Sequence, residues 1–283
     1  MRGSLNMYRV SKVLNNNGVI AIDMEENQEY VILGKGVGFG KKVSQRFDKP
    51  AECTLYRLEQ ETERGSAKEL VKGIGPEYLE IADEILTEAQ KVFGDSVDRG
   101  ILFPLADHIS FAVARIRRNE QISNPLTEDI KVLFYSEFKV AETLKTILKE
   151  RLQIEIDDHE VGYVALHIHS AIGDEKVSVA MQTARAVREC IDMIEKATGK
   201  PIDVLSLSYN RLMNHMKYMV ARASTGEKLN LDMNEYMLDQ YPQAYEIAAE
   251  ICKNLEGCIG HKLDETEIGY LAMHIQRVYK DAV

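Results

Sequence analysis

EIGYLAMHIQR, residues 267–277, nearly repeats EVGYVALHIHS, residues 160–170. Glutamate, glycine, tyrosine, alanine, histidine and isoleucine recur in the same order at an offset of 107 positions. In the earlier copy, Glu160, Tyr163 and His167 are spaced i, i+3 and i+7, which places them on one face of a helix. The chain therefore contains one helix twice, and each copy carries a histidine.

The repeat extends over a whole helical domain. LSYNRLMNHMKYMVARAST, residues 207–225, corresponds to residues 100–118, and YPQAYEIAAEICKNL, residues 241–255, corresponds to residues 134–148. Three helices matching in order at one offset indicate an internal duplication of a domain of roughly 105 residues. Apolar residues fall three and four positions apart, as in helices with one buried face. The pattern predicts helices over 76–93, 104–120, 136–152, 157–172, 177–199, 207–225, 241–255 and 264–279.

Four of the seven histidines follow the repeat. His108 and His215 are 107 positions apart, as are His167 and His274. The other three, His159, His169 and His261, have no counterpart at this offset. Each copy of the helical domain therefore carries a histidine pair, on its second and last helices.

These histidines allow three interpretations. An imidazole oriented by a carboxylate, such as that of Asp107 next to His108, is a nucleophile that can accept a group. A buried histidine bonded to a backbone carbonyl has a purely structural role. A metal could bind between His108 and His167, but His167 and His169 point about 200° apart on a helix and cannot chelate together. We expect no acidic or cysteine ligand to accompany the repeated pairs, and therefore no metal.

The first 60 residues have a different pattern. The segments 8–14, 18–22, 29–33 and 53–58 are short, rich in β-branched and aromatic residues, and separated by turn formers. They predict a four-stranded antiparallel sheet. Because so small a sheet buries little apolar surface alone, we expect it to pair with a second copy. The predicted fold is an all-β head followed by two duplicated all-α helical bundles, with domains at 1–60, 61–172 and 173–283.

The glycine-rich stretch GKGVGFGKK, residues 34–42, lies between two of these strands. It matches neither the P-loop template nor the dinucleotide fingerprint, which argues against nucleotide hydrolysis. Phe39 offers an aromatic face, the lysines offer charge, and the nearby asparagine triplet 15–17 offers amides, a combination suited to single-stranded bases and phosphates. A hairpin with a solvated lysine tip explains the same residues equally well.

Composition limits the function classes. The net charge of −10 argues against a general nucleic-acid binder, but residues 1–56 carry +2 and residues 57–283 carry −12. A polyanion is therefore tolerated at the head and repelled by the remainder. The four cysteines form no CxxC pair, no apolar run is long enough to cross a bilayer, and no signal peptide is evident. We expect a cytoplasmic, reduced protein without membrane insertion.

Together the motifs resemble the BglG/SacY/LicT family of bacterial transcriptional antiterminators along nearly the whole chain. KVLNNNGVIAI and EYVILGKGVGFGKK resemble the co-antiterminator RNA-binding domain. LADHISFA with EVGYVALHIHSA, and NRLMNHMKYM with EIGYLAMHIQR, resemble the two phosphotransferase-system (PTS) regulation domains. GKGVGFGKK and DHISFA are most similar to the glucose-type, GlcT-like branch.

The resemblance implies a function. In this family the head binds, as a dimer, an RNA hairpin called the ribonucleic antiterminator, and this prevents termination of a sugar operon. Phosphate arrives on regulatory histidines from the carrier HPr or from a sugar-specific enzyme II. The resemblance implies phosphorylation at His108, His167, His215 and His274. It implies RNA contacts at Lys12, Asn15, Asn17, Gly34, Lys35, Gly36, Phe39 and Lys41.

Two departures from the family pattern concern the RNA contacts. Gly18 is an insertion after the asparagines, and Lys35 stands where an arginine is frequent, so that a bidentate contact becomes a point charge. The alternative function is a PTS-regulated DNA-binding activator, which would need a helix-turn-helix head. An enzyme ranks third, because no nucleophile–base arrangement appears beyond the repeated histidines. We expect no catalytic residues, no cofactor and no metal.

Overall fold

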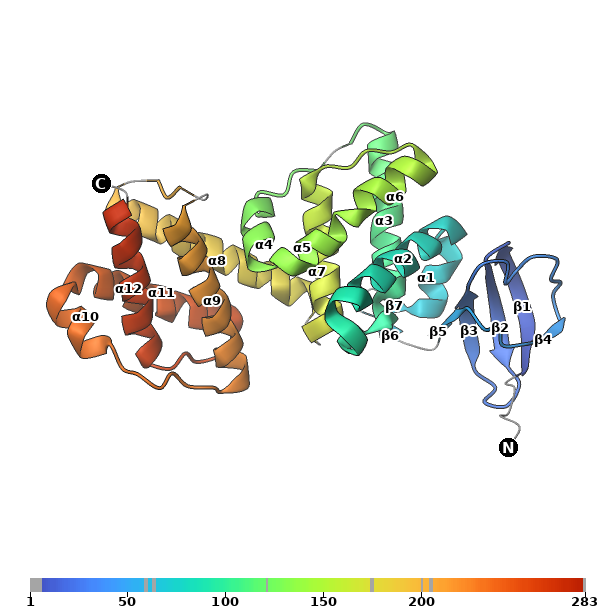
Figure 1. Ribbon diagram of the computed structural model, residues 1–283, viewed down its shortest axis with the longest axis horizontal. Helices are drawn as coiled ribbons and strands as arrows, with labels where there is room; N and C mark the ends of the chain where they lie inside the picture. Colours follow the sequence, from blue (N-terminus) through green and yellow to red (C-terminus); the bar gives the residue numbers. More distant parts are fainter. Residues whose placement is uncertain are drawn as a thin grey trace. The chain divides into compact units, whose positions relative to one another are not determined.

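The computed structural model describes residues 7–58, 61–62, 65–120, 122–173, 176–199, 201–203 and 206–281. The chain divides into two compact units (Figure 1). The first contains residues up to Ser123 and Ser136–Lys176, and the second contains Asn124–Tyr135 and the residues from Val177 onward. In the described residues, no helix is both long and apolar enough to cross a bilayer.

The head is an antiparallel sheet with the strand order β4-β1-β2-β3-β5. This confirms the predicted all-β head, but the sheet has five strands rather than four. The extra strand, β4 (Arg46–Asp48), has only three residues, too few to show an alternating pattern. The others are β1 (Met7–Asn15), β2 (Gly18–Asp23), β3 (Glu29–Leu33) and β5 (Thr54–Arg57).

The glycine-rich loop belongs to the core of the head. Val37 from this loop is buried with Tyr8, Val19, Ala21 and Ile32 of the first three strands. Val37 and the buried Gly38 therefore anchor the loop to the sheet, while Lys35, Gly36, Gly40 and Lys42 are exposed.

The first helical domain follows two short strands, β6 (Glu61–Thr62) and β7 (Gly65–Ser66). The helix predicted over 136–152 is two helices that meet at Glu142. The domain contains α1 (Ala67–Gly73), α2 (Pro76–Phe93), α3 (Leu102–Arg117), α5 (Tyr135–Ala141), α6 (Thr143–Leu152) and α7 (Asp158–Gly173), with the 3₁₀ turns η1 (Gly94–Ser96) and η2 (Arg99–Ile101).

The second unit repeats this plan and adds a helix from the first copy. Its own helices are α8 (Val177–Thr198), α9 (Leu207–Thr225), α10 (Asn234–Gln240), α11 (Pro242–Ile259) and α12 (Thr266–Asp281).

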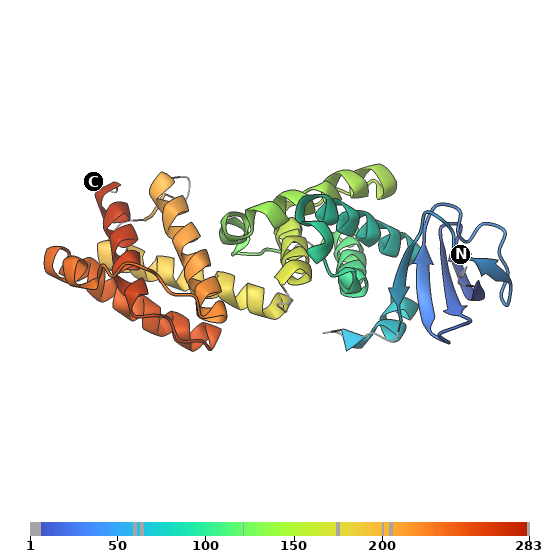
Figure 2. The ribbon, with the colours of Figure 1, turned by 60° about the horizontal axis from the view of Figure 1, so that its bottom comes forward.

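The added helix, α4 (Thr127–Leu133), precedes α10 by the repeat offset of 107. It nevertheless packs on α8 and α9, and the Tyr209 hydroxyl donates to Oδ1 of Asp129 at 2.9 Å. The helices that carry the histidines are neighbours in both copies: α3 contacts α7, and α9 lies beside α12 (Figures 1 and 2).

Candidate phosphorylation and RNA-binding sites

The first histidine pair is assembled by the packing of α3 against α7. His108 comes from α3 and His167 from α7, and their ring centroids are 5.3 Å apart. The ring of Tyr163, one helical turn before His167, lies 5.7 Å from His108. Residues separated by 59 positions in the sequence thus form one cluster.

The second pair is assembled in the same way. His215 on α9 and His274 on α12 stack with ring centroids 4.8 Å apart. Tyr270 takes the place that Tyr163 holds in the first copy, at 6.2 Å from His215. The duplication has therefore preserved a three-dimensional arrangement of side chains.

Each pair also includes a carboxylate from the last helix of its copy. Oε2 of Glu160 lies 3.4 Å from Nε2 of His108, and Oε2 of Glu267 lies 3.6 Å from Nε2 of His215. The expectation that no acidic group accompanies the repeated pairs is therefore wrong. Even so, no group of three or more histidine, cysteine or acidic residues suited to a metal occurs in the described ranges.

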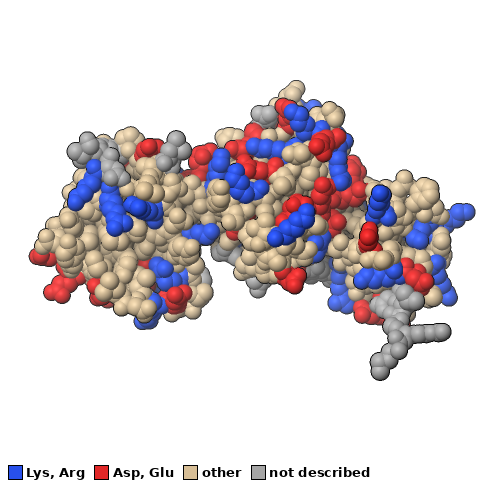
Figure 3. All heavy atoms as spheres, in the orientation of Figure 1, with Lys and Arg blue, Asp and Glu red and all other residues tan. Residues whose placement is uncertain are grey.

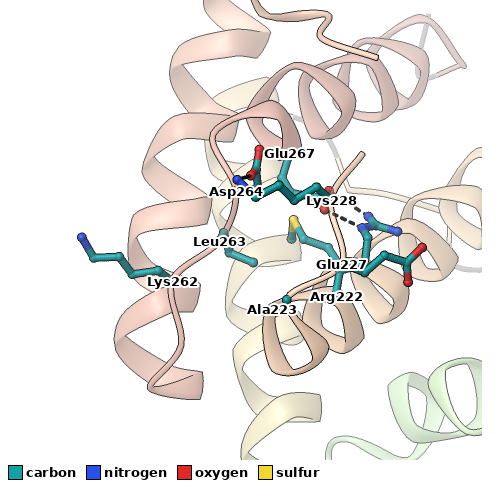
Figure 4. Close-up of a pocket in the computed structure, with 10 residues that line it drawn as sticks. Arg222, Ala223, Glu227, Lys228, Lys262, Leu263, Asp264 and Glu267 are labelled. Atoms are coloured by element: carbon teal, nitrogen blue, oxygen red, sulfur yellow. Dashed lines mark hydrogen bonds and ion pairs between the residues drawn. The ribbon is translucent and has the colours of Figure 1, made fainter. Parts of the chain in front are cut away.

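An arginine completes each cluster. Nη2 of Arg115 donates to Glu160 at 2.8 Å. Arg222 donates to Glu267 through Nε at 2.6 Å and Nη2 at 2.8 Å (Figure 4). The two arginines are 107 positions apart, so the repeat offset that found the histidines could also have found them. Sequence reasoning missed them because, on these two helices, it singled out only the histidines as candidate site residues.

The clusters are largely enclosed by helices. The side chains of His108 and His215 are each 9% exposed, against 5% for Glu160 and 2% for Glu267. Burial, the adjacent His274 and the charge of Arg222 favour the neutral ring and lower the pKa of His215 to about 3. Burial, with Arg277 and Arg211 nearby, lowers the pKa of His274 to about 4. Both rings are therefore neutral near pH 7.

Glu160 is ionised despite its burial. Desolvation alone favours the protonated acid, but attraction to His108 and Arg115 outweighs it and holds the pKa of the carboxyl below its ordinary value. The cluster thus places a buried negative charge beside a histidine ring. Outside the repeat, Nδ1 of His169 lies 2.9 Å from Oε1 of Glu137, which gives this histidine a structural partner.

The asparagine turn and the glycine-rich loop of the head are brought together at one end of the sheet. The N–H of Gly38 donates to the carbonyl of Asn16 at 2.9 Å, and the N–H of Gly34 donates to that of Asn17 at 2.9 Å. A Cβ at Gly38 would lie 2.0 Å from the Asn15 carbonyl oxygen, so only glycine permits this approach. The asparagine turn and the glycine loop therefore form a single platform.

The remaining candidates differ in exposure. Phe39 is 73% exposed, and Lys12 and Lys35 are exposed too. Lys41 is half-buried, with Nζ 4.3 Å from the centroid of the Phe47 ring. A phenylalanine so exposed contributes little to the core, which leaves its face available for stacking.

Two of the candidates are occupied within the chain. Nδ2 of Asn15 donates to Oε1 of Glu80 at 2.6 Å, and Nδ2 of Asn17 donates to Oε2 of the same carboxylate at 3.1 Å. Glu80 lies on α2 of the first helical domain. No sequence pattern pointed to Glu80, because the contact joins residues more than 60 positions apart.

Comparisons with known proteins identify the domains of the chain. The sequence matches the CAT RNA binding domain over residues 8–65 and the PRD domain over residues 83–171 and 188–278. It is 31% identical to the GlcA/glcB genes antiterminator of Staphylococcus carnosus (strain TM300) over 95% of this chain and 94% of the relative.

A relative from another genus and a solved structure extend this similarity. The transcription antiterminator LicT of Bacillus subtilis (strain 168) is 28% identical over 97% of this chain and all of the relative. The crystal structure of GlcT CAT-PRDI matches with a TM-score of 0.51 and 29% identity, covering 59% of this chain and 99% of that one. The chain therefore belongs to the BglG family of transcriptional antiterminators, in its GlcT-like branch, with a CAT RNA-binding domain followed by two PRD domains.

Proposed function

We propose that the chain binds an RNA hairpin in the leader of a sugar-PTS operon as a homodimer and prevents termination there, under the control of histidine phosphorylation. The head would occupy residues 1–60, and the regulation domains 61–172 and 173–283, acting in the cytoplasm. The observation that carries this proposal is the twice-built cluster of two histidines, a glutamate and an arginine behind a β-sheet head.

The head offers the chemistry that a folded RNA requires. The exposed ring of Phe39 would stack on an unpaired base, and Lys12, Lys35 and Lys41 would bind phosphates. The amides of Asn15 and Asn17 would contact base or ribose edges. Gly34 and Gly36 would let the RNA approach the backbone closely.

The histidines would accept phosphate from HPr or from an enzyme II. A neutral ring nitrogen forms a bond to phosphorus while the bond between phosphorus and the donor residue breaks, and the donor atom keeps the electron pair. The low pKa values of His215 and His274 keep their rings in the reactive neutral form near pH 7. Because the rings are enclosed, the helices of each pair must part locally to admit the donor.

Phosphorylation would change the charge of the site by about −2. At an interface between two acidic regulation domains, an added negative charge weakens association, whereas beside an arginine it strengthens the local structure. The proposal assigns the inhibitory signal from the sugar transporter to His108 and His167, and phosphorylation by HPr to His215 and His274.

The acceptor sites can be tested with the full chain and phosphorylated HPr. Phos-tag electrophoresis should show a retarded band that His215→Ala and His274→Ala reduce. His261→Ala is the matched control, because His261 is exposed and outside the repeat. A retarded band that survives both substitutions would exclude these histidines as the HPr acceptors.

The alternative function, DNA binding, requires a recognition helix in the head. Over residues 7–58 the head contains strands and no helix, so nothing in this range could enter a DNA major groove as a recognition helix does.

Size-exclusion chromatography with light scattering, run with and without the leader RNA, tests the proposed dimer. A complex of one chain with one hairpin would contradict it.

A further inference from the structure

Arg115 and Arg222 each contact the glutamate that lies next to a candidate acceptor histidine. In the first copy Oε1 of Glu160 accepts from Arg115, and Oε2 faces Nε2 of His108 at 3.4 Å. In the second copy both oxygens of Glu267 accept from Arg222, and Oε2 also lies 3.6 Å from Nε2 of His215. The same order, arginine, glutamate, histidine, occurs in both domains. A carboxylate thus lies between a guanidinium and the ring that we propose to be phosphorylated.

A phosphoryl group on Nε2 of the histidine would compete with the glutamate carboxylate for the arginine of that domain. It would carry nearly two negative charges into a site beside the side chain of Glu160 or Glu267, which is almost wholly buried and paired with an arginine. Two anions in contact in a poorly hydrated site repel each other strongly. A guanidinium binds phosphate through two parallel hydrogen bonds, so it can compensate the new charge if it leaves the carboxylate.

The two arginines are not equally available. Arg222 commits both Nε and Nη2 to Glu267, whereas Arg115 commits only Nη2 to Glu160. The Nε of Arg115 is buried and makes no hydrogen bond within the described part of the chain. Beside the Arg222–Glu267 pair a pocket of about 170 Å³ gives Glu267 room to move, and the Lys262 side chain points away from it (Figure 4).

We propose that Arg115 and Arg222 are the phosphate-binding residues of the two domains, which exchange Glu160 or Glu267 for the phosphoryl group of His108 or His215. This inference rests on the proposed phosphorylation of those histidines. The exchange breaks the arginine–glutamate ion pair and so converts a covalent modification into a rearrangement of α3 against α7, or of α9 against α12.

The test uses the full chain and potassium phosphoramidate, a small phosphoryl donor. Phosphohistidine at His215 is quantified by mass spectrometry of peptides kept at alkaline pH, and its half-life is followed after the donor is removed. Arg222→Ala should shorten that half-life at least threefold, and Arg222→Lys should restore part of it. Glu267→Gln should raise the phosphorylated fraction, because it frees the arginine. Arg188→Ala is the control, since Arg188 pairs with Asp192 on α8.

The outcomes separate this inference from the proposed function. An Arg222→Ala half-life equal to that of the unchanged chain, with no gain in Glu267→Gln, overturns the phosphate-binding role while leaving phosphorylation intact. Absence of phosphohistidine at all four acceptors in the unchanged chain would overturn the proposed function itself. If Arg222→Ala fails to fold by circular dichroism, Arg222→Lys and Glu267→Gln still decide the question.

A separate observation concerns the RNA-binding amides. The side-chain oxygens of Asn15 and Asn17 are used inside the head: that of Asn15 accepts from the N–H of Asn17 at 2.9 Å, and that of Asn17 accepts from the N–H of Gly36 at 3.0 Å. Only the Nδ2 donors face outward. Both of them are bound by the single carboxylate of Glu80.

The surroundings hold Glu80 in place. Nη1 of Arg151 lies 3.8 Å from Oε2 of Glu80, and Nη2 of Arg151 lies 2.5 Å from Glu84. One turn along α2, Asp83 accepts a hydrogen bond from the hydroxyl of Tyr56 on β5. A groove of about 340 Å³ runs between this face of α2 and the residues Asn17, Gly34 and Lys35. In the space-filling view, acidic side chains gather on the surface of the first compact unit (Figure 3).

We infer that Glu80 competes with RNA for the head and holds the unphosphorylated chain in a low-affinity state. An RNA base or phosphate oxygen needs the same two donors, and the acidic residues Glu80, Asp83 and Glu84 would repel a phosphate backbone. This inference rests on RNA binding by the head. Releasing α2 from the asparagine turn would expose the amides and remove the repulsion together.

Affinity of the full chain for the leader hairpin tests the competition. Glu80→Ala should tighten binding at least fivefold, measured by fluorescence anisotropy at constant salt. Glu88→Ala is the matched control, because Glu88 lies on the same helix, carries the same charge and pairs with Lys91 rather than with the head. A scrambled hairpin measured in parallel reports any gain that is merely electrostatic.

The result is decisive in either direction. Equal affinities for Glu80→Ala and Glu88→Ala would overturn the competition, while specific binding by both would leave the proposed function standing. Failure of the unchanged chain, and of both variants, to distinguish the leader hairpin from the scrambled one would instead overturn RNA recognition. A gain shared by both hairpins would also refute the inference, because a simple loss of charge would explain it.

Discussion

The ring of His274 stacks on the ring of His215, with centroids 4.8 Å apart and planes inclined by 27°. Nε2 of His215 and Nδ1 of His274 are buried, and neither makes a hydrogen bond within the part of the chain that the structure describes. Two cationic rings in such contact would repel each other. The stacked pair is therefore built for the neutral form, which is also the form that accepts a phosphoryl group.

This arrangement makes stability depend on pH. In the unfolded chain His215 binds a proton below its ordinary pKa of 6.5, whereas in the folded chain its pKa is about 3. Between these values the unfolded state binds more protons, so stability is constant above pH 6.5 and falls as the pH decreases toward 3. At pH 5 the loss from this ring is about 2 kcal/mol.

Urea unfolding monitored by circular dichroism at pH 7.5 and pH 5 measures the effect. His215→Gln, which cannot take the proton, should lose less stability between the two pH values than the unchanged chain does. His261→Gln should behave like the unchanged chain, because His261 is exposed. The same pH-dependent loss in all three proteins would contradict a buried neutral His215.

The second prediction concerns base stacking on the head. Phe39→Ala should weaken binding of the leader hairpin by about 1–3 kcal/mol, the usual contribution of one stacked base. Val43→Ala is the control, because Val43 is also exposed, at 64%, and follows the same loop. Titrations of the full chain by fluorescence anisotropy would show it, and unchanged affinity in Phe39→Ala would rule out stacking there.

The third prediction concerns the first regulation domain. If phosphate on His108 carries the inhibitory signal, His108→Ala should read through the terminator without the inducing sugar. A reporter gene placed behind the leader terminator measures this in cells. His159→Ala serves as control, since His159 has no counterpart in the repeat. Induction by the sugar that is unchanged in His108→Ala would refute the assignment.

The fourth prediction tests the platform of turn and loop. Gly38→Ala places a Cβ 2.0 Å from the carbonyl oxygen of Asn15 and must displace the asparagine turn. We expect the free energy of unfolding to fall by about 2 kcal/mol and RNA binding to weaken, because so close a backbone contact strains the folded head. Gly73→Ala, which meets no atom within 4 Å, should leave RNA binding unaltered. Thermal unfolding and RNA titration of both variants distinguish the two cases.

The sequence predicted the long elements well because periodicity reports burial directly. The segments 76–93 and 207–225 coincide with α2 and α9, since their apolar residues recur over four or more turns. The strand β4 and the helices α1, α4 and α10 have seven residues or fewer and were missed. So short a segment contains too few repeats to distinguish a periodic pattern from chance.

The histidine pairs could be predicted from the sequence, whereas the contact of Glu80 with the head could not. The histidine pairs could be predicted because the duplicated sequence contains each histidine twice, at one offset. In the structure, the packing of α3 on α7 places His108 beside His167. The contact of Glu80 with Asn15 and Asn17 could not be predicted, because it occurs once and depends on how the head meets α2. Side chains joined only by tertiary packing leave no local signal.

The most direct test of the account is the affinity of the full chain for its leader hairpin before and after phosphorylation by HPr. Phosphorylation should change the dissociation constant at least fivefold, and the change should vanish when His108, His167, His215 and His274 are all replaced by alanine. Identical affinities for the phosphorylated and unphosphorylated chains, with phosphohistidine verified by mass spectrometry, would contradict control of RNA binding by these histidines.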